Sequence, residues 1–382
     1  MANILDYIDW RGDLSFEVSP FCSIDALVLA QLSYIPFEGI VEEKFGRPIP
    51  LSIAAMRFDP ESVPEKLRIV SFREDCELIE KLKGSIRFGN IMLEGYVSEL
   101  GETQAMQFAA LTCILPDGKR FISFRGTDST LVGWKEDFNF SYLNETPSQK
   151  RAVKYIDENL SGNAHRLLLG GHSKGGNLAV YAAMNCADEI RERIERIYDL
   201  DGPGFRDEIA ASEKYKRIIG RIESIIPESS LVGQLLTDNV RHSIVKSTAS
   251  GLGQHIIYTW QVKGTRPELT HELSTTGSII NKTMSSWLSS MDDESRRMLV
   301  KAIFDVLEAP EAETFTELGK GSLRSYGAVL GALRRLAPEQ QKVLIAAFKR
   351  LAKSGRNALF SELSENTTQL LEEHRSREQA EG

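Results

Sequence analysis

Residues 167–184, LLLGGHSKGGNLAVYAAM, join an apolar run, a glycine-rich turn and a helical pattern. The apolar run at 167–169 is typical of a short strand buried in a parallel sheet. The pentapeptide at 171–175, GHSKG, fits the pattern G-x-S-x-G. A strand–turn–helix setting is the context in which that pattern forms a nucleophile elbow. We therefore interpret Ser173 as a candidate catalytic nucleophile.

The flanking glycines support this interpretation on steric grounds. An elbow turn is so tight that the residues two before and two after the serine must lack bulk, and Gly171 and Gly175 meet that condition. The alternative is a glycine-rich turn without chemistry, or a phosphate-binding loop. Neither G-x-x-x-x-G-K-[ST] nor G-x-G-x-x-G fits the stretch, which argues against a phosphate-binding loop.

Strand and helix patterns alternate from about residue 90 onward. Apolar and β-branched runs predict strands at 90–100, 103–115, 120–126, 165–171, 194–201, 221–227 and 242–248. Helical periodicity predicts helices at 148–160, 175–194 and 205–220. This order predicts an α/β fold with a mostly parallel central sheet flanked by helices.

The chain divides into three parts by pattern. We expect an N-terminal helical segment at 1–85 that packs on the core, an α/β core at 86–280, and a C-terminal helical region with a frayed tail at 281–382. Acidic and basic residues are interspersed, with a net charge of −8, which argues against a nucleic-acid partner. No apolar stretch is long enough for a transmembrane helix, and the N-terminal residues do not resemble a signal peptide.

The cysteines and the absence of metal-binding motifs give two further expectations. Four cysteines lie far apart without a C-x-x-C pair, which predicts free thiols in a reducing compartment, and hence the cytoplasm. No H-E-x-x-H motif or Cys/His cluster occurs, so we expect no metal and no cofactor. No oligomeric state follows from the sequence.

A second motif lies upstream of the serine, in FISFRGTDSTLVGWKEDFNF at 121–140. It places the segment 124–127, FRGT, at a strand end, followed by a polar turn, Trp134 and Asp137. Together with GHSKGG, this arrangement resembles the class 3 lipases, and most closely a bacterial lipase-like branch with additional helices at both ends. The resemblance covers about residues 85–262 and implies an α/β-hydrolase fold. The serine motif of that family usually reads GHSLGG, so Lys174 is a departure.

The resemblance implies an oxyanion hole and a lid. Thr127 would donate its backbone N–H, and also its hydroxyl, to the oxyanion, and the backbone N–H of Lys174 would be the second donor. Residues 128–134, DSTLVGW, would form a short amphipathic lid. The alternatives are that Thr127 is a turn residue bonded to its own loop and that 128–134 is a packed surface loop.

A general base is needed to activate the serine, and histidine is the usual one. Of the six histidines, three are disfavoured by position: His172 inside the elbow, His165 at the wrong end of its strand, and His374 in the polar tail. In the α/β-hydrolase order the histidine follows the last strand, which favours His255 over His242 and His271. The alternative for His255 is a loop histidine bonded to backbone.

The acid is less clearly marked. The class 3 lipases carry an aspartate in D-x-V-P, and the matching stretch here, IIPESSLVGQLL, has Ser230 at that position. Glu228 lies two residues earlier and is the first candidate, with Asp201 in DLDGPGF as the second. Asp201 also fits an ordinary turn. Asp238, or no carboxylate at all, remains open.

These residues together predict a serine esterase that cleaves a small-molecule ester or acyl substrate through an acyl-enzyme. A thioesterase or acyltransferase would use the same residues, because fold does not separate these reactions. The alternative from another class is a lipase-like module with weak or no activity that binds a protein partner.

Overall fold

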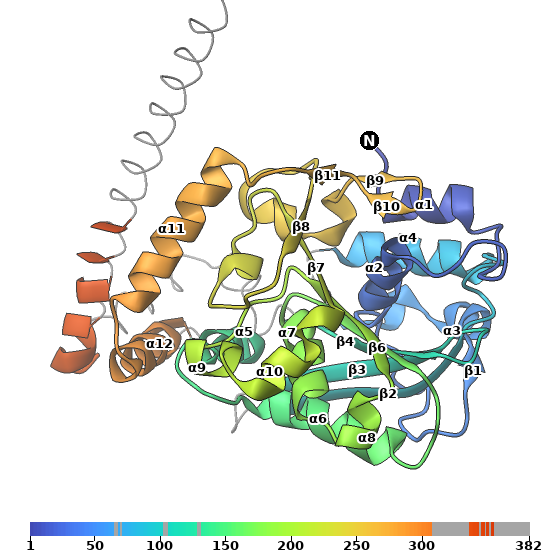
Figure 1. Cartoon of the computed structure of the whole chain (residues 1–382), viewed down its shortest axis with the longest axis horizontal. Helices are drawn as coiled ribbons and strands as arrows, with labels where there is room; N and C mark the ends of the chain where they lie inside the picture. Colours follow the sequence, from blue (N-terminus) through green and yellow to red (C-terminus); the bar gives the residue numbers. More distant parts are fainter. Residues whose placement is uncertain are drawn as a thin grey trace, which may run out of the picture.

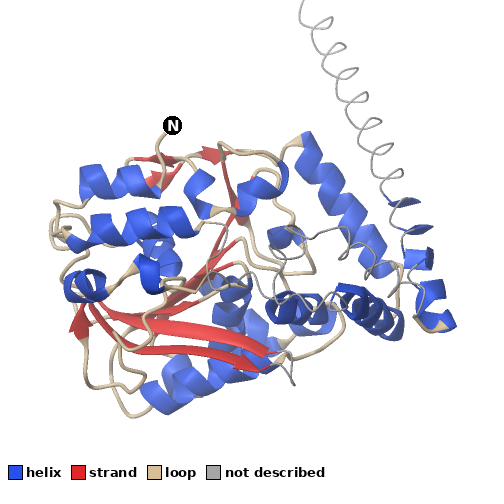
Figure 2. Ribbon diagram, turned by 180° about the vertical axis from the view of Figure 1, so that it is seen from behind, coloured by secondary structure: helices blue, strands red, loops and turns tan. Residues whose placement is uncertain are grey.

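The computed structural model describes residues 1–64, 68, 71–101, 106–127, 131–307, 336–343, 345–347, 349–350 and 353–354. A nine-stranded sheet lies at the centre of this part of the chain, with helices on both faces (Figures 1 and 2). The protein is therefore a mixed α/β structure. None of the helices in the ranges above is both long and apolar enough to cross a membrane.

The strand order across the sheet is β1-β2-β3-β4-β5-β6-β7-β8-β11. The strands have these bounds: β1 Ile49–Pro50, β2 Met92–Gly101, β3 Met106–Ile114, β4 Arg120–Phe124, β5 Leu167–His172, β6 Ile194–Leu200, β7 Ile222–Pro227, β8 His242–Val245 and β11 Leu269–Thr270. A separate two-stranded ribbon pairs β9, Val262–Lys263, with β10, Arg266–Pro267.

The sheet is mixed, so the prediction of a mostly parallel sheet is wrong. Strands β4 to β8 run parallel, whereas the pairs β1–β2, β2–β3, β3–β4 and β8–β11 are antiparallel. Four of the eight neighbouring pairs are thus antiparallel. The physical reason is connection length: residues 115–119 between β3 and β4 suffice for a hairpin but not for the crossover that parallel strands need.

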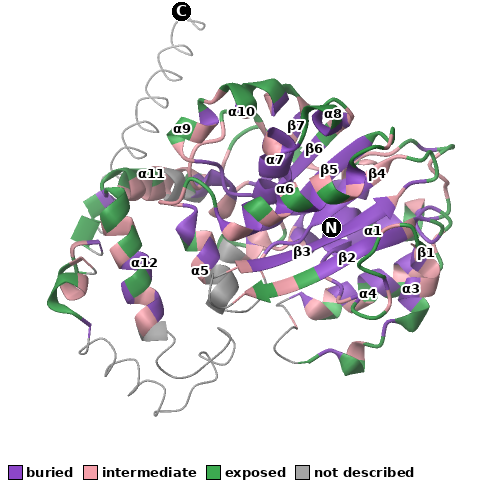
Figure 3. Ribbon diagram, turned by 90° about the horizontal axis from the view of Figure 1, so that it is seen from below, coloured by how far each residue is buried: buried purple, intermediate pink, exposed green. Residues whose placement is uncertain are grey.

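Two hydrophobic clusters cover the two faces of the sheet. Leu168 of β5 belongs to the cluster that contains α1 (Ile4–Arg11), α2 (Ser23–Leu32) and α4 (Phe72–Lys83). Leu167 and Leu169 belong to the cluster that contains α6 (Pro147–Leu160), α7 (Lys174–Asn185) and α10 (Glu213–Ile218). This alternation is the period of two expected along a strand, and it explains why the apolar run at 167–169 is buried on both sides. Figure 3 shows the buried strands between these layers.

The helices have these bounds: α1 Ile4–Arg11, α2 Ser23–Leu32, α3 Leu51–Arg57, α4 Phe72–Lys83, α5 Leu131–Asn139, α6 Pro147–Leu160, α7 Lys174–Asn185, α8 Asp188–Arg191, α9 Asp207–Ala210, α10 Glu213–Ile218, α11 Thr275–Ser289 and α12 Asp293–Leu307. The single helix predicted over 205–220 is therefore two short helices, α9 and α10. Ser212 caps α10 by accepting from the amide of Tyr215, which separates the two.

The N-terminal and C-terminal parts both contact the central region. In the N-terminal part, the ring of Phe21 lies 6.0 Å from that of Phe121 on β4. In the C-terminal part, Phe304 of α12 lies 5.9 Å from Phe138 of α5, centroid to centroid. The residue before α11 also contacts the loop after β7, because the backbone N–H of Ser274 donates a hydrogen bond to the carbonyl of Glu228. The division of the chain at residues 85 and 280 stays a prediction.

Parallel strands β4 to β7 end at one edge of the sheet, which is where ligands bind in open α/β sheets. The residues that follow these strands are Thr127 after β4, Ser173 after β5, Asp201 after β6 and Glu228 after β7. The topology therefore brings together most of the residues selected from the sequence.

Candidate active site

The backbone at Ser173 has the strained conformation of an elbow. Ser173 has φ 58° and ψ −131°, a left-handed value that non-glycine residues rarely adopt, and it joins β5 directly to α7. A Cβ on Gly175 would lie 2.1 Å from the carbonyl oxygen of Phe124, and one on Gly171 would lie 2.4 Å from the backbone of Gly175. The turn thus depends on both glycines.

The loop after β4 lies directly against this serine. A Cβ on Gly126 would be 3.0 Å from the Cβ of Ser173, so Thr127 follows immediately beside the elbow. The hydroxyl of Thr127 donates to Asp137 of α5 at 2.5 Å. Because a hydroxyl carries one proton, this bond leaves the backbone N–H as the donor that Thr127 can offer to a ligand.

Asp137 is a buried carboxyl group with a perturbed pKa. Burial raises its pKa to about 6, while the ammonium of Lys174 and the hydroxyl of Thr127 act in the opposite direction. Above pH 6 Asp137 is therefore a carboxylate, and Thr127 is held as its donor.

Lys174 presents its backbone and its side chain to different surroundings. It is the first residue of α7, so its amide has no intrahelical acceptor. Its side chain is 1% exposed, and Nζ donates to the carbonyl oxygen and the Oε1 of Gln107, both at 2.8 Å, and to Glu136 Oε2 at 3.2 Å. The charge that was unexplained from the sequence therefore belongs to a buried ion pair.

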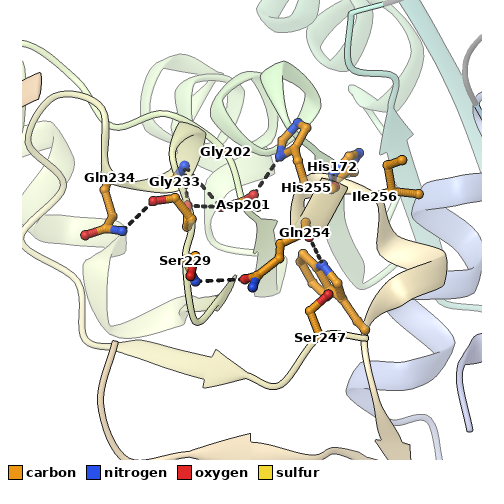
Figure 4. Close-up of polar contacts among 12 residues, drawn as sticks. His172, Asp201, Gly202, Ser229, Gly233, Gln234, Ser247, Gln254, His255 and Ile256 are labelled. Atoms are coloured by element: carbon orange, nitrogen blue, oxygen red, sulfur yellow. Dashed lines mark hydrogen bonds and ion pairs between the residues drawn. The ribbon is translucent and has the colours of Figure 1, made fainter. Parts of the chain in front are cut away.

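A histidine–aspartate pair lies next to the elbow (Figure 4). His255 Nδ1 and Asp201 Oδ2 are 2.6 Å apart. The other oxygen of Asp201 accepts from the hydroxyl of Ser230 and from the amide of Gly233 at 3.1 Å, and the side chain is fully buried. With Nδ1 bonded to the carboxylate, Nε2 is the nitrogen of His255 that is free to accept a proton.

His172 fastens His255 to the elbow. Its Nε2 donates to the backbone carbonyl of His255 at 2.7 Å, its Nδ1 accepts from the hydroxyl of Tyr34 at 3.2 Å, and the two imidazole centroids are 4.5 Å apart. Burial, together with the neighbouring His255, holds the pKa of His172 well below its usual range, so His172 is neutral. Because His172 precedes Ser173, this contact sets His255 beside the serine.

Within the described ranges, no hydrogen bond joins the hydroxyl of Ser173 to His255. Catalytic hydrogen bonds are often long in an unliganded enzyme and shorten when substrate binds. Ser173 and His255 are thus linked through His172, without a direct bond between them.

The structure brings Asp201, not Glu228, to the histidine. Among the described residues, no hydrogen bond or ion pair joins the Glu228 carboxylate to a histidine, and the backbone carbonyl of Glu228 accepts from the amide of Ser274. Ser230, at the position of the class 3 lipase aspartate, donates its hydroxyl to Asp201 instead. A carboxylate from the end of β6 therefore occupies the place expected for one from the end of β7.

The other sequence candidates lie elsewhere. His242 is bound to Asp238 at 3.2 Å and to Ser224 at 2.9 Å, away from the elbow. His271 is exposed, and His374 lies outside the described residues. Residues 128–130 of the expected lid also lie outside them, as do the side chains of 131–134, although the backbone of 131–134 is the start of α5.

Two partners of the Lys174 side chain, Gln107 and Glu136, were not predicted from the sequence. One signal could have indicated them: a lysine in an elbow that is otherwise glycine and apolar residues needs a buried acceptor, because lysine is almost never fully buried unless it is paired. The residue that supplies the acceptor could not be read from spacing alone.

The fold and this geometry define a lipase-like class of protein, and a comparison of sequences supports it. A family model described as Mbeg1-like matches residues 82–305, more than half of the chain. The chain belongs to the Mbeg1-like family, and the resemblance to lipase-like proteins related to the class 3 lipases is confirmed. No curated protein matches the chain.

Three solved structures of lipases are similar to this chain at low identity. The M37 lipase is 14% identical with a TM-score of 0.36, over 55% of this chain and 68% of that one. The Rhizomucor miehei lipase in its propeptide complex is 16% identical with a TM-score of 0.32, over 42% and 58%. The extracellular lipase LipA from Serratia marcescens is 15% identical with a TM-score of 0.29, over 56% and 40%.

Proposed function

We propose that this protein is a serine carboxylester hydrolase with an α/β-hydrolase fold. One observation carries the proposal: Ser173 stands in a strained elbow at φ 58°, and His255, which is paired with Asp201, is bonded through its backbone carbonyl to His172, the residue before the serine. Nucleophile, base and orienting acid in this relation are the signature of covalent serine catalysis.

The proposed reaction follows from the position of each group. Ser173 Oγ attacks the ester carbonyl and gives its proton to His255 Nε2, while Asp201 holds the imidazole and stabilises its protonated form. The backbone N–H groups of Thr127 and Lys174 bind the oxyanion. His255 then protonates the leaving alcohol, and a water molecule activated by His255 hydrolyses the acyl-enzyme.

We propose residues 86–280 as the catalytic core, since every group in this mechanism lies within that range. The four cysteines, all described, are free thiols. This supports the proposal that the enzyme works in a reducing compartment such as the cytoplasm.

The proposal is tested with a fluorophosphonate probe, which reacts only with an activated serine. We expect one label per folded chain in the wild type and none in Ser173→Ala. A p-nitrophenyl ester series of increasing chain length, assayed in parallel, then defines the acyl preference. Absence of labelling in the folded wild type would overturn the proposal and favour a binding module without activity.

A further inference from the structure

Two adjacent acidic residues of α5 each contact one of the residues whose backbone N–H is proposed to bind the oxyanion. Asp137 accepts from the hydroxyl of Thr127 at 2.5 Å, and Glu136 binds the ammonium of Lys174 at 3.2 Å. Side chains at consecutive helical positions point about 100° apart. α5 therefore contacts the loop after β4 through Asp137 and the start of α7 through Glu136.

Glu136 is the centre of a fully buried polar cluster. Its carboxylate accepts from the backbone N–H of Gln107 at 3.0 Å and from the backbone N–H and the hydroxyl of Ser148 at 2.8 and 2.5 Å, in addition to Lys174. Glu136 and Lys174 have side chains 0% and 1% exposed. Apolar residues often replace a buried ion pair without loss of stability, so stability alone does not explain this one.

The opposite side of α5 is covered as well. Phe138 packs edge-to-face on Phe304 of α12, and the ammonium of Lys135 lies 5.8 Å from the centre of the same ring. Lys135 and Phe138 are three positions apart and therefore share a helix face. α5 thus contacts α12 on one side, and on the other its buried Glu136 binds Lys174 at the start of α7.

We propose that Glu136 and Lys174 are positioning residues for the oxyanion hole, fixing the start of α7 to the helix that also holds Thr127. These contacts of α5 then act together with the pairing of β4 and β5 in setting the spacing between the two backbone donors. This inference rests on the proposed function. It also implies that α5 does not swing outward as a lid, because such a movement would break the Glu136–Lys174 ion pair and leave the buried ammonium with only the neutral acceptors of Gln107.

The test uses the full chain with Lys174→Met, Glu136→Gln and the double variant. We expect kcat for a soluble p-nitrophenyl ester to fall about 10- to 100-fold in each, with KM within about twofold, because displaced oxyanion donors weaken only the transition state. Labelling by the fluorophosphonate should slow to a similar extent. The double variant removes both charges, so it should unfold at a higher temperature than Lys174→Met while its kcat stays low.

A matched control is a second fully buried ion pair, Arg87 with Asp25 at 2.6 Å, both side chains 0% exposed. Asp25→Asn should lower the melting temperature but leave kcat within about twofold. Wild-type kcat in folded Glu136→Gln and in the double variant, with Ser173 still labelled, would overturn the positioning role alone. A wild type that does not label would overturn the proposed function and this inference with it.

Discussion

Two sets of serine, histidine and aspartate lie in this molecule: Ser173, His255 and Asp201 at the elbow, and Ser224, His242 and Asp238 around β7 and β8. In the second set both contacts of the histidine are formed, to the serine at 2.9 Å and to the aspartate at 3.2 Å. In the first set only the histidine–aspartate contact is formed, at 2.6 Å. When hydrogen bonds and ion pairs are counted together, the second set looks the more complete.

The backbone around each serine nevertheless favours Ser173 over Ser224 as the candidate nucleophile. Ser173 ends a strand at φ 58° and begins a helix, next to amides that can bind an oxyanion. Ser224 lies inside β7, is 2% exposed, and has its hydroxyl bonded to His242. Three residue types within bonding distance therefore do not identify a nucleophile by themselves, and the proposed assignment of Ser173 depends on the turn that presents its hydroxyl.

Replacing the two serines gives the largest expected difference. We predict that Ser173→Ala lowers kcat/KM for a p-nitrophenyl ester by about 10⁴-fold or more, because the attacking oxygen is removed. Ser224→Ala should keep activity within about threefold. Steady-state kinetics on both variants, with thermal unfolding as the folding check, measures this; equal losses would contradict the assignment of the elbow.

Replacing the two aspartates gives the next largest effect. Asp201→Asn should lower kcat by about 10³- to 10⁴-fold, since the amide cannot hold His255 in the tautomer that accepts the serine proton. Asp238→Asn is the control at the second set and should change kcat by less than about threefold. A loss at Asp238 as large as that at Asp201 would mean that the second set takes part in the reaction.

Asp199, which lies beside the second set, should make the stability of the fold depend on pH. Burial, and the nearby carboxylates of Asp238 and Asp201, hold the pKa of Asp199 well above its usual range. A carboxyl group with a raised folded-state pKa stabilises the fold below its unfolded pKa, near 4, and that stabilisation is lost as pH rises through the folded value.

Asp199→Asn should therefore have a melting temperature about 2–4 °C above that of the wild type at pH 8, and little difference near pH 4. Thermal unfolding across that range is the measurement. An increase of the same size at every pH would show that packing, and not ionisation, is responsible.

The smallest expected effect concerns Glu228, the first candidate for the acid from the sequence. Glu228→Ala should change kcat by less than about twofold, because its carboxylate has no bond to His255 among the described residues. Assaying it beside Asp201→Asn separates the two candidates directly. A loss comparable to that of Asp201→Asn would return Glu228 to the role of the acid.

Local chemistry made part of this site predictable. A strand that ends in a glycine-flanked serine and continues as a helix is specified by contiguous residues, so the elbow around Ser173 followed from its own segment. The position of Thr127 after β4 and of His255 after β8 followed from chain order. The predicted strands at 103–115 and 120–126 are separated by a connection that suffices only for a hairpin, but their antiparallel pairing was not predicted.

The α/β pattern, the elbow and the family resemblance could be read from the sequence, because each depends on short motifs of contiguous residues. The pairing of Asp201 with His255 is visible only in the folded chain, since the two residues are 54 positions apart and Ser230 binds the same carboxylate. The tertiary structure also decided the partner of Lys174, which lies 38 positions away in Glu136. Such pairings depend on how strands and helices pack against one another. That packing depends on contacts between residues far apart in the sequence, which no local pattern specifies.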